Sequence, residues 1–118
     1  MTDVKGLLLE VLEAYGYPVI LQGTLSQDAA YPPAFFTFWN NATNDQSFYD
    51  NDPSVTVWDF DVNFYATDAG LVNAQLLAAK SALRGRGFIV NGAGYDIASD
   101  EPTHTGRGIN AIYIDREG

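Results

Sequence analysis

Residues 55–66 read Val-Thr-Val-Trp-Asp-Phe-Asp-Val-Asn-Phe-Tyr-Ala, and large apolar side chains alternate with polar ones from Trp58 to Phe64. Successive side chains of a β-strand point to opposite faces. The apolar face would carry Trp58, Phe60, Val62 and Phe64, and the polar face Asp59, Asp61 and Asn63. This pattern predicts a strand that packs one face on a core and turns the other face away from it.

A second strand is predicted just before it, where residues 34–39 read Ala-Phe-Phe-Thr-Phe-Trp. Aromatic residues favour strands, and here they fall on both faces, with Phe36 and Phe38 on one and Phe35 and Trp39 on the other. Between the two strands, residues 40–54 are rich in Asn, Asp and Ser, which favour turns. We therefore expect a long hairpin loop or arm at about 40–54.

Two helices are predicted from apolar residues that recur every three or four positions. The first covers residues 4–15 and ends at Gly16, whereas the second follows the N-cap Asp68 and runs to about Arg84. Shorter extended segments are predicted at 19–22, 88–90, 95–98 and 109–115.

The resulting order is α-β-β-β-α-β-β over a single α+β domain, residues 1–118. Strands that pair with close sequence neighbours, and helices that share one face, predict a two-layer sandwich with a mainly antiparallel sheet. One face of the sheet would lie under both helices and the other would be free.

Composition excludes several classes of function. The chain has six Lys and Arg against 15 Asp and Glu, a net charge of −9, and its basic residues are scattered. A surface that binds nucleic acid or an anionic membrane needs clustered basic residues. The absence of cysteine excludes disulfides and thiolate chemistry. No N-terminal signal or membrane-spanning run is recognisable, so we expect a protein made in the cytoplasm.

Few residues suggest catalysis or metal binding. His104 is the single histidine and lies among turn residues, with no Cys/His motif around it. Asp59 and Asp61 would point to the same side of a strand, about 7 Å apart, with no obvious third ligand. We expect no enzyme, no cofactor and no metal, while a divalent-metal-dependent hydrolase built on Asp59, Asp61 and His104 stays an alternative.

Eleven of the 16 aromatic residues lie between Tyr31 and Tyr65. A two-layer domain can cover only one face of the hairpin, which leaves an apolar patch for a partner to cover. The residues expected at a subunit interface are Phe35, Trp39, Phe48 and Tyr49, with Arg107 in an intersubunit ion pair. Asp59 and Asp61 would form charge pairs across such an interface. A monomeric module that binds a foreign peptide or protein is the alternative.

Four stretches, 31–41, 58–66, 87–88 and 99–108, resemble small structural proteins of tailed bacteriophages and prophages. The element order is similar to the tail-terminator, or tail completion, family of long-tailed phages. This resemblance implies a homohexameric ring at the tail–head junction of the virion, with the tail tube protein and the head–tail connector proteins as partners.

DNA would pass through the ring without sequence-specific binding, and Asp59 and Asp61 would then pair charges or line the lumen. An adaptor or stopper of the connector, or a minor capsid protein, is the alternative within the same class. The resemblance carries over no catalytic residue.

Overall fold

The computed structural model describes residues 3–22, 32–49, 52–99 and 102–116, and the side chains of 3–22, 32–43, 55–99 and 102–115. The elements are α1 (Val4–Glu13), β1 (Val19–Leu21), β2 (Ala34–Tyr49), β3 (Asp52–Ala66), α2 (Ala69–Gly85), β4 (Tyr95–Ile97) and β5 (Thr105–Arg116). This order confirms the predicted α+β fold.

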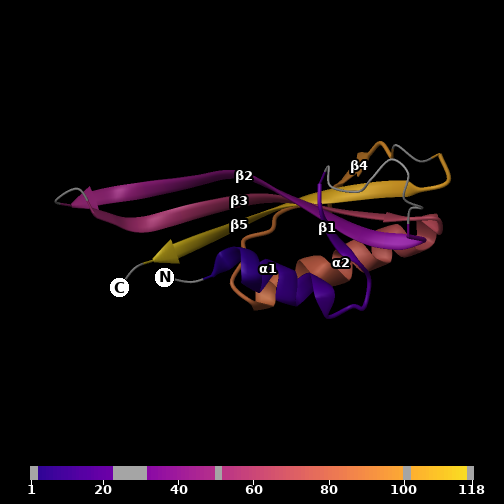
Figure 1. Ribbon diagram of the computed structural model, residues 1–118, viewed down its shortest axis with the longest axis horizontal. Helices are drawn as coiled ribbons and strands as arrows, with labels where there is room; N and C mark the ends of the chain where they lie inside the picture. The colour runs from indigo at the N-terminus through magenta and orange to yellow at the C-terminus, as the bar shows by residue number, and fades with distance from the viewer. Residues whose placement is uncertain (1–2, 23–31, 50–51, 100–101, 117–118) are drawn as a thin grey trace.

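The five strands form one open sheet in the order β1-β2-β3-β5-β4. β1 runs parallel to β2, and all other neighbours are antiparallel. Both helices lie on the same side of the sheet, as predicted (Figure 1). The molecule is elongated, with extents of 53 × 29 × 22 Å, and the far end of the β2–β3 hairpin extends beyond both helices (Figure 1).

The core lies between the helices and the sheet. The predicted apolar face of β3 is in it, and Phe60, Val62 and Phe64 are each fully buried. The helices contribute Val4, Leu8, Val11 and Leu12 from α1, and Val72, Leu76, Ala79 and Leu83 from α2. The stripe predicted for each helix is therefore the face that it buries.

Both helices begin at an aspartate. The side chain of Asp3 accepts a hydrogen bond from the N–H of Gly6 at 3.0 Å, and that of Asp68 accepts one from Gly70 at 3.0 Å. These bonds satisfy N–H groups that have no partner within the helix. After α1 the chain turns at Gly16, whose φ of 82° suits glycine best.

Of the hairpin loop or arm expected at about 40–54, the structure has the arm, because the two long strands continue through this segment. β2 and β3 pair from Ala34↔Ala66 as far as Tyr49↔Asp52, with one irregularity between Asn40 and Ala42. β5 pairs with the other edge of β3 up to Val55↔Arg116. Backbone pairing on both sides of β3 outweighs the turn preference of the Asn- and Asp-rich segment.

The C-terminal half departs from prediction in two places. Residues 88–90 do not form a strand, and they contribute a single bridge in which Ile89 and Ile112 exchange two backbone hydrogen bonds of 2.7 and 3.0 Å. The last strand begins at Thr105 rather than Ile109, because β5 pairs with β3 all the way to Ala66↔Thr105. None of the described helices is long and apolar enough to cross a membrane.

Two glycines in β5 let neighbouring side chains lie flat across that strand. A Cβ built on Gly106 would lie 2.7 Å from the ring of Tyr65. One built on Gly108 would lie 2.3 Å from Asn63 Oδ1 and 2.9 Å from the ring of Tyr95. Real Cβ atoms do not approach other atoms so closely, so both positions require glycine.

We predict that Gly108→Ala lowers the free energy of unfolding by about 1–3 kcal/mol, because the new methyl group overpacks this site. The measurement is urea denaturation followed by circular dichroism. Gly85→Ala is the matched control, since nothing lies within 4 Å of its Cβ position. This control should leave stability unchanged or raise it by up to about 1 kcal/mol. Equal denaturation midpoints for the two variants would contradict the packing argument.

Candidate functional site

The helix-free face of the sheet carries the most distinctive group of polar side chains. Strand register aligns Trp39 of β2, Asp61 of β3 and Asn110 of β5 in one row across the sheet. Asp59 lies two residues from Asp61 on the same face, as predicted, and Tyr95 of β4 lies on this face at the neighbouring row. Four strands thus contribute to one surface.

Asn110 holds the two aspartates together. Its Nδ2 donates to Asp59 Oδ1 at 2.6 Å, to Asp61 Oδ1 at 3.4 Å and to the carbonyl of Phe60 at 3.2 Å. Asn41 Nδ2 adds a longer bond of 3.3 Å to Asp59 Oδ1. In these hydrogen bonds, neutral amides rather than cations contact the carboxylates. The charge of the two carboxylates is thus offset by no cation in these contacts.

That charge acts on Tyr95, whose hydroxyl donates a hydrogen bond to Asp61. Partial burial raises the pKa of Tyr95, and the charges of Asp61 and then Asp59 raise it further. The phenol thus stays protonated, as a donor to the carboxylate.

An aromatic cluster around the buried Phe35 occupies the other end of the same face. Phe35 is only 3% exposed, because it stacks on Tyr65 with ring centroids 5.2 Å apart and meets the edge of His104 at 5.9 Å. The expectation that Phe35 belongs to an exposed patch is therefore wrong. Gly106 is the reason, since it leaves room for Tyr65 to lie over β5 beside Phe35.

His104 ties two loops together. Its Nε2 lies 2.8 Å from the carbonyl oxygen of Pro32, and its Nδ1 lies 2.9 Å from Thr103 Oγ1. The ring thus links the segment before β5 to the segment before β2. These contacts occupy both ring nitrogens within the chain.

The alternative metal centre on Asp59, Asp61 and His104 does not form. Asp61 pairs with Asn110, whereas His104 lies six residues before Asn110, just outside β5, which begins at Thr105. At about 3.4 Å per residue this separation is about 20 Å. In the part of the chain that the structure describes, no group of three or more His, Cys, Asp or Glu could hold a metal ion.

Arg107 makes its ion pair within the chain. Its Nη1 lies 2.5 Å from Asp96 Oδ1, and its Nη2 donates to the carbonyl of Ala93 at 3.1 Å. The side chain is only 24% exposed. Within the chain this ion pair joins β5 to β4, and the intersubunit ion pair of Arg107 stays a prediction.

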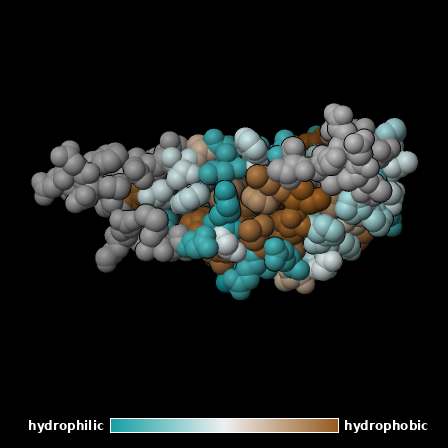
Figure 2. Space-filling model, in the orientation of Figure 1, coloured by the Kyte–Doolittle hydropathy of each residue, from teal (hydrophilic) through white to brown (hydrophobic). Residues whose placement is uncertain are grey.

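Trp39 differs from these buried groups, because it is 48% exposed beside Asp61. Phe48 and Tyr49 lie at the end of β2, and their side chains fall outside the described residues. Figure 2 shows a further hydrophobic area around β1, where the sheet meets α1. β1 is wholly apolar, and its Leu21 is 38% exposed.

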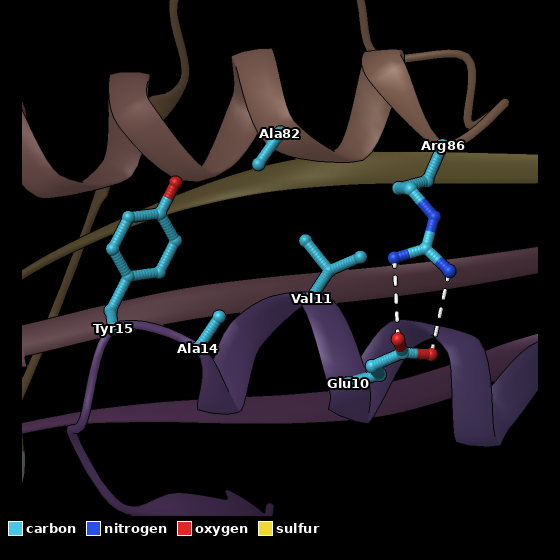
Figure 3. Close-up of a pocket in the computed structure, with 6 residues that line it drawn as sticks. All are labelled: Glu10, Val11, Ala14, Tyr15, Ala82 and Arg86. Atoms are coloured by element: carbon cyan, nitrogen blue, oxygen red, sulfur yellow. Dashed lines mark hydrogen bonds and ion pairs between the residues drawn. The ribbon is translucent and has the colours of Figure 1, made fainter.

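A groove of about 410 Å³ lies between the two helices (Figure 3). It is lined by Glu10, Val11, Ala14, Tyr15, Ala82 and Arg86. The guanidinium of Arg86 contacts the carboxylate of Glu10 at 3.4 and 3.5 Å, and the hydroxyl of Tyr15 donates to the carbonyl of Ala78 at 2.9 Å. The polar groups of the groove thus connect one helix to the other, and no nucleophile–base pair lies among them.

Sequence reasoning identified Asp59 and Asp61 but missed their partners. Asn110 and Tyr95 can be recognised as neighbours of the two aspartates only once the register of β3, β5 and β4 is known. The sequence held one signal of these contacts. In β5, Gly106 and Gly108 fall on the same face as Asn110, which indicates that this face leaves room for side chains from the neighbouring strands.

A scan against protein-family models and a search of curated proteins both find no match to this chain.

We predict that Asp61→Asn lowers the pKa of Tyr95 toward its ordinary value of about 10. The amide still accepts the hydrogen bond of the phenol but no longer carries the charge that opposes tyrosinate. NMR titration of carbon-labelled tyrosine rings, with Tyr95→Phe to assign the signal, measures the shift. Asp59→Asn should have the smaller effect, because Asp61 acts more strongly on Tyr95.

The same pKa predicts how stability depends on pH. Since the folded-state pKa of Tyr95 is raised, its contribution is complete below about pH 10 and is lost as the pH rises through the folded-state value. Tyr95→Phe should flatten this alkaline loss in denaturation curves. An unchanged tyrosine titration in Asp61→Asn would contradict the proposed coupling.

Proposed function

We propose that this protein is a virion structural subunit of a long-tailed bacteriophage or prophage. As a homo-oligomeric ring, with six copies expected, it caps the tail tube and joins the tail to the head connector. It acts by ending the tube and providing a docking surface, and not by catalysing a reaction. The phage assignment is supported by the sequence resemblance and by the α-β-β-β-α-β-β order of elements.

One observation carries the assembly part of the proposal. The far end of the β2–β3 hairpin continues past both helices, so no helix covers it (Figure 1). Two-layer domains normally bury one face of each sheet against a second layer. In a molecule only 22 Å thick along its shortest axis, another copy is the simplest source of the missing layer.

The helix-free face supports the same proposal. Trp39 is exposed next to two carboxylates whose hydrogen bonds come from neutral amides. A large exposed aromatic side chain beside polar groups is typical of protein interfaces. The carboxylates could also face a central channel, where a ring of subunits of net charge −9 would repel passing DNA.

We predict that the purified protein forms a species of about six times 12.9 kDa, alone or on a tail tube. Size-exclusion chromatography with light scattering, followed by native mass spectrometry, measures it. Trp39→Ser should weaken this association, because it removes an exposed aromatic contact. Leu77→Ser is the matched control, since Leu77 is also exposed (38%) but lies in α2, outside the sheet.

A second measurement tests the capping role itself. Purified tail tube protein from the same genome is allowed to polymerise with and without this chain, and tube lengths are compared by electron microscopy. The proposal expects shorter tubes with a ring at one end. A protein that stays monomeric at high concentration and leaves tube length unchanged would overturn it.

A further inference from the structure

β2 has a long edge with no strand beside it in the described part of the chain. β1 pairs only with Phe36, Thr37 and Phe38, and the N–H of Gln22 adds one bond of 3.0 Å to the carbonyl of Phe38. β2 continues for eleven residues beyond Phe38, to Tyr49, and pairs there only with β3. Backbone groups along this edge thus lack a described partner.

The hydrogen-bond pattern identifies which groups these are. The N–H of Phe36 and the carbonyl of Phe38 bond to the β1 side, so even-numbered residues turn their backbone groups away from β3 at that point. The irregularity between Asn40 and Ala42 inserts one residue and shifts this alternation. Beyond it, Thr43, Asp45 and Ser47 are the residues that direct N–H and C=O groups outward.

The sequence of this edge lacks two of the commonest protections against pairing. Proteins commonly block exposed edges with Lys or Pro, or with very short strands. Residues 43–49 read Thr-Asn-Asp-Gln-Ser-Phe-Tyr, with neither Lys nor Pro. The strand interruption lies before them, so Thr43–Tyr49 is an unbroken pairing segment.

The opposite side of the same sheet has a second free edge. β4 pairs with Gly106–Gly108 of β5, and Ile89 bridges Ile112 through two backbone bonds. Beyond Ile112 no described residue pairs with the outer edge of β5. By the same alternation, Ile114 and Arg116 direct their backbone groups outward there.

We propose that Thr43–Tyr49 of one copy pairs with Tyr113–Arg116 of the next copy, so that the sheet continues from subunit to subunit. This inference rests on the ring proposed above and states which strands would hold neighbouring subunits together. β2 and β5 run in the same direction within one chain, because each is antiparallel to β3. Rotation about a ring axis that runs along the strands keeps that direction, so the junction is a parallel strand pair.

Ring closure favours this arrangement over a symmetric pairing of two β2 edges, because a symmetric pairing uses the same edge of both copies and stops at a dimer. A head-to-tail contact uses both free edges of every subunit, which is how a ring closes.

The absence of cysteine makes a cross-linking test unambiguous. Asn44→Cys, Gln46→Cys and Phe48→Cys, whose positions fall on the same face of the sheet as Ile114, are each combined with Ile114→Cys and oxidised. Within one chain β3 separates the two cysteines, and two strand spacings of about 4.8 Å exceed the reach of a disulfide of about 7 Å. Any disulfide in these variants therefore joins two copies.

At least one pair should give a ladder of covalent oligomers on a non-reducing gel, and each single-cysteine variant should give no species larger than a dimer. Pairing the same β2 cysteines with Thr105→Cys, at the far end of β5, is the matched control and should give no ladder. Ser47→Pro should reduce association roughly tenfold or more, because it removes an outward N–H but no bond to β3. Circular dichroism should show that this variant folds.

The outcomes separate this inference from the function on which it rests. Oligomers in light scattering with no ladder from any pair would overturn the strand junction and leave the ring in place. Efficient dimers of the single variant Gln46→Cys would show the symmetric β2–β2 junction and also overturn it. A monomer under all conditions would overturn the ring together with its junction.

Discussion

The fold depends on β3 being hydrogen-bonded along its length on both sides. β2 pairs with one edge of it and β5 with the other, over twelve residues from Val55 to Ala66. One face of the same strand supplies Phe60, Val62 and Phe64 to the core. Everything else is arranged around this strand: the helices cover its apolar face, and its polar face carries the two aspartates.

The sequence predicts the fold well where the signal is local. Aspartate caps and the three-to-four spacing of apolar residues locate both helices, and strict alternation locates β3. Prediction fails where the signal comes from elsewhere in the chain. Residues 40–49 look like a turn by composition, but they extend because β3 offers them backbone partners, and β3 is itself held by β5.

In the candidate site, too, the sequence predicts the local features and not those that depend on distant residues. That Asp59 and Asp61 share a side follows from their spacing, and their common contact with Asn110 agrees with it. That Asn110 and Tyr95 complete the group depends on a pairing between strands about 50 residues apart, which no local pattern encodes. The burial of Phe35 likewise depends on Gly106 and His104, far away in the sequence.

The position of β5 between β3 and β4 has a consequence for how the chain reaches this structure. Its partner β3 lies on the far side of α2 in the sequence, so folding must close a long loop before the sheet is complete. Until then the nascent β2–β3 hairpin has an open inner edge next to Phe60 and Phe64. Such intermediates fold slowly and are prone to aggregate, so the rate of β5 docking should limit the yield of native protein.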